Sequence, residues 1–494
     1  MLKKIALAAL CLSSLCGTAV AQDAATVIAN ARNALGNVRS IVYRGSARDV
    51  AFQQCGANAA QMICYGTHDP MRPIHNYVRV IDLDAPTSRH AGDTLNVAGG
   101  PSTELVAGKF FQQVTPEQAD LSQPWGASLE LYITPWGFLE GAARRNATAT
   151  RAVIDGKPYT VLSWSPEVKA PSGASYRIDG YVNEQNLIER VETWLGENIM
   201  GDMHIVAEYL DWMDFNGTIA PTRIVQTRGG WPYFEVHVKD AQANPANIAS
   251  IAPAPERPAA PGGFGGASQS FEIIKEQLGD GLFRYTTAGF SYDSLVVEFE
   301  DHIMMLEAGQ NQARAQAYVD EIKRQFPGKP IRYVMVTHPH SDHTGGLPVL
   351  VAEGATIIAH ENAREFFERA FGTPRTLLDD ALARNPRVPR IETVSDMRVY
   401  SDGKRTVELY HVYPAPHSDA LLIAYFPKEK VLFQGDFSVI PGEPANDHVQ
   451  ALVATIERLG LDYERYINVH ASAEPQTRAD VEAAMRLRKE RASN

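Results

Sequence analysis

The stretch VTHPHSDHTGG, residues Val336–Gly346, places three histidines and an aspartate within six positions. A short apolar run, IRYVMVT, leads into it and predicts a buried strand that ends near Thr337. His338 and His340 are two residues apart, so in extended backbone their side chains point to the same side. Gly345-Gly346 then permits a tight entry into a following helix. Neutral imidazole and carboxylate groups bind zinc, iron and manganese, so this turn is a candidate metal site.

One turn cannot complete two metal sites. His338 and His340 are placed to share one metal, and Asp342 and His343 are aimed at a second point a few ångströms away. Further ligands must come from other strand ends, where active-site residues of α/β folds gather. Three candidates stand at exits from predicted apolar strands: His417 in YPAPHSDALLIAY, Asp436 in VLFQGDF and His470 in YINVHAS.

The motif THPHSDH, supported by these three residues in the same order, resembles the Thr-His-x-His-x-Asp-His signature of the metallo-β-lactamase fold hydrolases. The resemblance covers Phe271 to Asn494 and implies an α/β fold, a four-layered αβ/βα sandwich with the metals at one edge of two facing sheets. Around two of the histidines this sequence departs from the pattern. It has Pro-His-Ser where relatives often have Gly-His-Thr, and Asn-Val-His-Ala where they often have Pro-Gly-His-Gly.

The resemblance also implies a division of the ligands. The first metal would be bound by His338, His340 and His417, and the second by Asp342, His343 and His470. Asp436 would bridge both, as in the branch that includes the glyoxalase II-type thioesterases. A bridging aspartate argues against β-lactam hydrolysis in particular.

The activity implied by the resemblance is that of a metal-dependent hydrolase. Two Zn²⁺ ions, or iron or manganese, would activate a hydroxide that attacks an ester, thioester, lactone or related small-molecule substrate. Asp342 would be catalytic as well as metal-binding, because it could orient this nucleophile. Two alternatives stay open: a mononuclear iron dioxygenase of sulfur compounds on the same fold, and a binding protein with a vestigial site. His448, in VIPGEPANDH, is a candidate for lining the substrate opening.

The beginning of the chain predicts export. Met1 to Lys4 supplies a positive start, and Ile5 to Cys16 is an apolar run too short to span a bilayer comfortably. Ala19-Val20-Ala21 offers small residues for cleavage, which predicts a signal peptide over residues 1–21, cleaved after Ala21. The location would then be periplasmic or secreted. An uncleaved anchor is the alternative.

Two cysteines remain after such a cleavage, Cys55 and Cys64. An oxidising compartment favours a disulfide between them. The alternative is two unpaired buried thiols. The formal net charge of −12 excludes a general nucleic-acid binder, which would present a basic face.

The 494 residues predict more than one domain. Residues 22–243 show strand–turn–strand patterns, such as YRIDGYVNEQNLIERVETWLG and the Asn216-Gly217 hairpin signal, and predict an antiparallel β-rich domain of the α+β class. Residues 244–270 are dense in Pro, Ala and Gly and predict a linker. Residues 271–494 form the predicted metallo-β-lactamase fold domain.

The amino-terminal stretches GYVNEQNLIERVET and GTIAPTRI also resemble the curved sheets of periplasmic lipid-carrier proteins. This implies a module for an apolar ligand or a membrane-derived substrate. The alternative is a scaffold that packs on the catalytic domain. The sequence predicts no oligomeric state.

Overall fold

The computed structural model describes residues 23–50, 71–95, 105–251, 272–288, 292–470 and 475–493. Three sequence predictions fall outside this part: the signal peptide over residues 1–21, the Cys55–Cys64 disulfide, and all of the linker except residues 244–251. They stay predictions. In the described residues, no helix combines the length and apolar character needed to cross a membrane.

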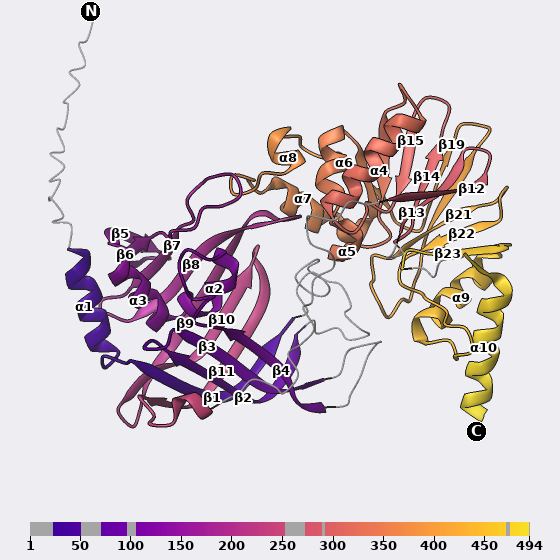
Figure 1. The fold of residues 1–494 in the computed structure, drawn as a ribbon. Helices are drawn as coiled ribbons and strands as arrows, with labels where there is room; N and C mark the ends of the chain where they lie inside the picture. Colours follow the sequence, from indigo (N-terminus) through magenta and orange to yellow (C-terminus); the bar gives the residue numbers. More distant parts are fainter. Residues whose placement is uncertain are drawn as a thin grey trace, which may run out of the picture.

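The amino-terminal domain is built on one antiparallel sheet of eleven strands (Figure 1). Their order in space is β4-β3-β2-β1-β11-β10-β9-β8-β7-β6-β5. The Asn216-Gly217 signal is confirmed as the turn between β9 and β10, where both residues have positive φ. The strands are β1 Ser40–Asp49, β2 Arg72–Asp82, β3 Thr87–Leu95, β4 Leu105–Val114, β5 Thr148–Ile154, β6 Lys157–Trp164, β7 Ile178–Val182, β8 Ile188–Glu197, β9 Gly201–Phe215, β10 Thr218–Arg228 and β11 Trp231–Ala243.

Three helices pack with this sheet: α1 Ala24–Ala34, α2 Trp125–Tyr132 and α3 Pro135–Arg144. Thr134 caps α3 by accepting a hydrogen bond from the backbone of Gly137, and Pro135 occupies the first helical position, where its missing N–H costs nothing. Glu130 of α2 lies between Arg79 of β2 and Arg228 of β10 and forms ion pairs with both. This largely buried pairing ties α2 to the sheet.

The carboxy-terminal domain has two mixed sheets that face each other. The first contains β12 Ile273–Gly279, β13 Leu282–Thr287, β14 Ser294–Glu298, β15 Ile303–Leu306, β16 Ile331–Met335, β17 Thr356–His360 and β18 Ile391–Val394. The second contains β19 Met397–Ser401, β20 Thr406–His411, β21 Leu422–Phe426, β22 Val431–Gln434, β23 Arg465–Asn468 and β24 Gln476–Thr477.

Helices cover the outer faces of both sheets. The first sheet carries α4 Gln312–Gln325, α6 Leu347–Glu353, α7 Arg364–Gly372 and α8 Ala381–Arg384, and the second carries α9 Asp447–Leu459 and α10 Arg478–Ser493. A separate hydrophobic core, which includes Met304 and Phe433, fills the space between the two sheets. The predicted αβ/βα sandwich and the β-rich domain before it are therefore confirmed.

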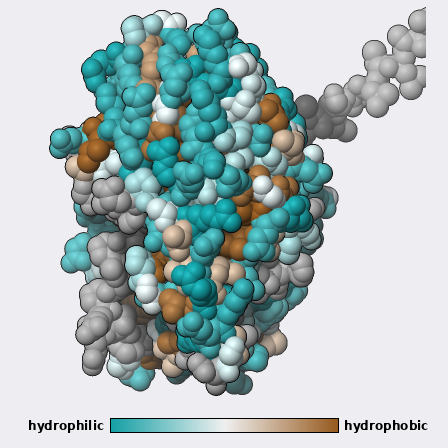
Figure 2. Space-filling model, turned by 90° about the vertical axis from the view of Figure 1, so that its right-hand side faces the viewer, coloured by the Kyte–Doolittle hydropathy of each residue, from teal (hydrophilic) through white to brown (hydrophobic). Residues whose placement is uncertain are grey.

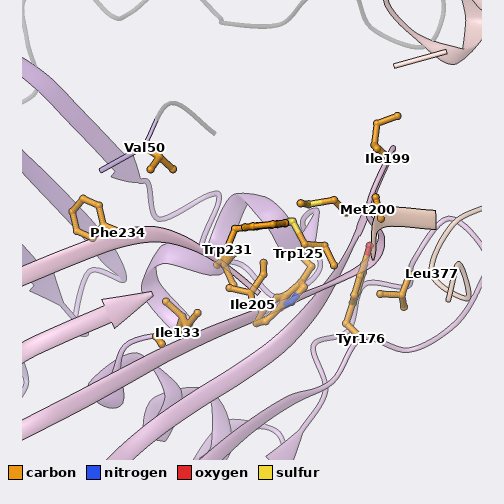
Figure 3. Close-up of a cluster of buried hydrophobic side chains, with 14 of the residues drawn as sticks. Val50, Trp125, Ile133, Tyr176, Ile199, Met200, Ile205, Trp231, Phe234 and Leu377 are labelled. Carbon is orange, nitrogen blue, oxygen red and sulfur yellow. The ribbon is translucent and has the colours of Figure 1, made fainter. Parts of the chain in front are cut away.

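The two domains share buried contacts. Ile199 and Met200 lie in the turn between β8 and β9, and Leu377 follows α7; all three belong to one continuous hydrophobic cluster. Figure 3 shows Leu377 beside Tyr176, and Met200 beside Trp231. Asp202 at the start of β9 accepts hydrogen bonds from the backbone of Thr376 and Leu377, at 2.8 and 2.9 Å. The amino-terminal domain thus packs on the carboxy-terminal domain through both apolar and polar contacts.

The face of the molecule shown in Figure 2 is mainly hydrophilic, with small hydrophobic areas scattered over it. Among the described large apolar side chains, Val388 and Val153 are the most exposed. Single exposed apolar side chains of this kind are ordinary on a soluble surface and indicate no interface by themselves.

Candidate metal centre

All seven predicted ligands lie together where strands of the two facing sheets end. The turn after β16 carries His338 and His340, and the one-turn helix α5, Ser341–Thr344, carries Asp342 and His343. The others come from the second sheet: His417 from the loop between β20 and β21, Asp436 from the end of β22 and His470 from the end of β23. A hydrogen bond of 2.7 Å from Leu422 N to the Thr337 carbonyl joins the sheets beside this cluster.

The first group consists of His338, His340, His417 and Asp436. The Nε2 atom of His338 lies 2.9 Å from His340 Nδ1, 3.0 Å from His417 Nε2 and 3.1 Å from Asp436 Oδ2. The other ring nitrogen of His338 faces the hydroxyl of Thr337 at 3.1 Å. Three imidazoles and a carboxylate therefore converge on one point.

The second group consists of Asp342, His343, Asp436 and His470. His470 Nε2 lies 2.8 Å from Asp436 Oδ1, 3.1 Å from Asp342 Oδ2 and 3.3 Å from His343 Nε2. Asp436 belongs to both groups, with Oδ2 facing the first and Oδ1 facing the second. In each group the candidate ligand atoms all lie within 4.8 Å of one another. This is the division of ligands that the sequence motif implied.

The second group gathers two carboxylates and two imidazoles around one point, a donor set that fits a cation. The buried carboxylate of Glu307 accepts a hydrogen bond from His343 Nδ1 at 2.9 Å, and a carboxylate–histidine pair of this kind is the usual support of a metal-binding histidine. Although burial opposes the charge on His343, the carboxylates of Asp436, Glu307 and Asp342 raise its pKa well above the usual value. The Nε2 atom, 3.1 Å from Asp436 Oδ1, therefore carries a proton that a bound cation would replace.

Protonation states differ between the two groups. Burial, together with the neighbouring His343, lowers the pKa of His338 to about 4, and burial also holds the pKa of His340 well below its usual value. Burial opposes the charge on His470 too, but hydrogen bonds to Asp342 and Asp436 raise its pKa to about 9. The imidazoles of His338 and His340 are thus neutral and ready to bind at pH 7, whereas His343 and His470 must each release a proton to bind a metal.

Solvent reaches the cluster through three of its ligands. The side chains of His338 and His343 are fully buried, whereas those of His417, Asp436 and His470 are 11%, 15% and 26% exposed. His448, near the start of α9, has its ring centroid 5.3 Å from that of His417. The residue is almost fully buried, so it borders the cluster without being open to solvent.

Sequence reasoning missed the residues that hold the ligands. Glu307, at the end of β15, accepts hydrogen bonds from Thr337 N at 2.7 Å and from the Tyr292 hydroxyl at 2.9 Å, in addition to its contact with His343. The sequence signal that could have identified Glu307 is its position directly after a wholly apolar strand, IMML. Gly435 was also missed: a Cβ there would lie 2.8 Å from Thr337 Oγ1, so only glycine lets Asp436 approach.

Comparisons with known proteins agree on one part of the chain. Residues 287–491 match the model of the metallo-beta-lactamase superfamily. A curated relative, 2,4-dinitroanisole O-demethylase subunit alpha from Nocardioides sp. (strain JS1661), is 27% identical over 199 residues, which are 39% of this chain and 53% of that protein. The chain therefore spans about half the length of this relative.

Solved structures of low identity were also found. A metallo-beta-lactamase from Pontibacter korlensis is 15% identical and aligns over 44% of this chain and 99% of its own, with a TM-score of 0.34. The DIM-1 metallo-beta-lactamase is 18% identical and aligns over 45% of this chain and 100% of its own, also with a TM-score of 0.34.

The matched residues contain the whole His/Asp cluster. They begin at the end of β13 and end in α10, so they include the turn after β16, the three strand ends of the second sheet and the supporting Glu307. The sandwich, the motif turn and the family model refer to the same segment. Residues 287–491 therefore belong to the metallo-beta-lactamase superfamily.

Proposed function

We propose that the chain is a metal-dependent hydrolase with a dinuclear site, in which zinc occupies the two groups around Asp436. The observation that carries the proposal is the convergence of seven ligand side chains on two points that share one carboxylate. Imidazole and carboxylate ligands suit zinc, and also iron or manganese. Metal ions bound there would supply a nucleophile at neutral pH and polarise the substrate oxygen.

The chain's own residues set the direction of attack. His417, Asp436 and His470 are the partly exposed ligands, so the substrate approaches from their side, while His338 and His343 form the buried floor. Although burial opposes ionisation of Asp342, the neighbouring His343 and His470 hold its pKa well below the usual value. Asp342 is therefore ionised at pH 7 and can accept a hydrogen bond from an attacking water molecule.

The substrate class we propose is an ester, thioester, lactone or related small molecule, because Asp436 takes the bridging place that glyoxalase II-type thioesterases use. The name of the curated relative, an O-demethylase subunit acting on 2,4-dinitroanisole, adds aryl methyl ethers to the compounds worth testing. Oxidation of sulfur compounds at a single iron is the competing activity.

Two further parts of the proposal concern the chain outside the cluster. Export through the signal peptide would place the enzyme in the periplasm or outside the cell, with the Cys55–Cys64 pair oxidised. The amino-terminal sheet would bind an apolar or membrane-derived molecule and present it to the metal centre. Activity of the full chain on the same substrate, free and in lipid vesicles, tests this presenting role.

The deciding experiment is metal quantification joined to a substrate panel. Purified full-length protein is analysed for zinc, iron and manganese, and is then assayed on esters, thioesters, lactones, phosphodiesters, 2,4-dinitroanisole and thiols with oxygen monitoring. We expect close to two zinc ions per chain and hydrolysis without oxygen uptake. One iron per chain with oxygen uptake on thiols would overturn the hydrolase proposal in favour of the dioxygenase.

Replacing His340 tests the first group alone. His340→Ala removes one of the three imidazoles of the first group, so we expect loss of about one metal ion per chain and a fall in activity on the order of 10²-fold. His360→Ala is the matched control, because this histidine, at the end of β17, contacts the Ser395 carbonyl and belongs to neither group. Equal metal content in both variants would contradict the assignment of His340.

A further inference from the structure

The turn between β8 and β9, residues 198–200, brings the amino-terminal domain to the metal-binding turn. Its shape is fixed from within, because Glu197 Oε2 accepts hydrogen bonds from Ile199 N at 2.8 Å and Met200 N at 2.7 Å. Ile199 and Met200 are both buried in the shared hydrophobic cluster, next to Trp231 in the case of Met200 (Figure 3). The position of Asn198 is therefore set by the residues that follow it.

Asn198 uses its side-chain amide to reach across the domain boundary. Its Nδ2 donates a hydrogen bond to the carbonyl of Gly345, and its Oδ1 accepts one from Gln312 at the start of α4. Because Gln312 occupies the oxygen, the amide nitrogen is directed at Gly345. The main-chain carbonyl of Asn198 accepts a separate hydrogen bond of 2.7 Å from Arg375.

Gly345 directly follows α5, the single turn of helix that carries Asp342 and His343. It is packed without slack: a Cβ at this position would lie 2.1 Å from the Gln310 carbonyl oxygen and 3.0 Å from that of Ser341. Any movement of the Gly345 carbonyl would therefore also move α5, which is only four residues long. The hydrogen bond from Asn198 opposes such a displacement.

We propose that Asn198 is a positioning residue of the metal centre, through which the amino-terminal domain aims Asp342 and His343 at the second group. The first group depends on it less, because Thr337, beside His338, is held by Leu422 and Glu307 within the carboxy-terminal domain. This inference rests on the proposed metal-binding function. It assigns the amino-terminal domain a part in the metal site itself.

The test measures the affinity for both metal ions in the full chain. Metal-free wild type, Asn198→Ala and Asn198→Asp are titrated with Zn²⁺ against a chromophoric chelator, and two dissociation constants are fitted. For Asn198→Ala we expect one ion to bind about tenfold more weakly and the other to change less than twofold, because a ligand-bearing turn loses its outer support. Asn198→Asp keeps the size but cannot donate, so its loss should be at least as large.

Ser172→Ala is the matched control, since it removes another hydrogen bond between the domains, from Ser172 Oγ to the Thr376 carbonyl, but leaves the hydrogen bond to Gly345 in place. We expect both of its affinities to stay within twofold of wild type. The proposal is overturned if Asn198→Ala matches wild type, or if Ser172→Ala weakens the same ion equally. A wild-type chain that binds no metal would instead overturn the proposed function.

Correct folding of each variant is checked by tryptophan fluorescence and circular dichroism. All six tryptophans belong to the amino-terminal domain, and Trp231 also stacks with Arg369 of α7, so fluorescence follows this domain and its contact with the carboxy-terminal domain. If Asn198→Ala fails to fold, Gln312→Leu is used in its place, because it removes the donor that orients the Asn198 amide. The affinity for the same ion should then fall by a smaller factor. An unchanged affinity in Gln312→Leu would then count against the proposal.

Discussion

Asp436→Ala is expected to abolish activity, with a loss on the order of 10³-fold or more, about 4 kcal/mol of transition-state stabilisation. Its carboxylate is common to both groups and lies within 3.1 Å of four imidazole nitrogens, those of His338, His343, His417 and His470. Removing it leaves the imidazoles of both groups without the anion they share. Metal content should fall from about two ions per chain to one or fewer.

The measurement combines metal analysis with activity on the best substrate from the panel. Asp447→Asn is a suitable control, because Asp447 begins α9 near the cluster but pairs on the surface with Arg488. It should keep both metal content and activity. An Asp436→Ala protein that still held two ions per chain would show that this carboxylate does not bridge the groups.

Glu307→Leu is expected to cause the largest loss of stability, about 3–5 kcal/mol. The substitution leaves three buried donors, on Thr337, His343 and Tyr292, without the acceptor that they share. Glu307→Gln keeps one oxygen but turns an N–H group towards the same donors, so about 1–3 kcal/mol is expected. His343 would also lose the partner that fixes its tautomer, and affinity for the second ion should fall by about 10- to 100-fold.

Denaturant unfolding can separate this effect from damage elsewhere. Circular dichroism follows the whole chain, whereas tryptophan fluorescence reports on the amino-terminal domain and on its contact with α7 through Trp231. In Glu307→Leu, the unfolding transition that is detected by circular dichroism but not by fluorescence should move to lower denaturant concentration. Glu276→Gln, a half-exposed partner of Arg284, should shift it by less than about 1 kcal/mol. A Glu307→Leu protein as stable as this control would contradict the role given to Glu307.

The sequence predicted the ligand cluster because metal binding demands particular residue types. His338, His343 and Asp436 are recognisable by their chemistry and by their place after apolar strands. Their supports are not, since many residues can accept a hydrogen bond. Glu307 looks like any carboxylate at a strand end, and Asn198 lies in the other domain, so its contact with Gly345 depends on how the domains pack.

The fold, like the metal centre, was predictable only in part. The strand expected to end near Thr337 is β16, and the Asn216-Gly217 signal lies at the turn between β9 and β10. Helix α2 was not predicted because its eight residues are apolar on most sides and leave little amphipathic period to detect. Helix α3 was also not predicted, although its apolar residues follow a helical period. The Thr134-Pro135 start signal was the local clue.

The pairing of β1 with β11 has a consequence for synthesis of the chain. Ile41 pairs with Ala243, so the strand made first waits in the nascent polypeptide until the last one has left the ribosome. Until then the early hairpins leave one long edge uncovered, and closing so large a loop is slow. The amino-terminal domain should therefore complete only once β11 is available to pair, and the exposed edge before that is a site for chaperone binding.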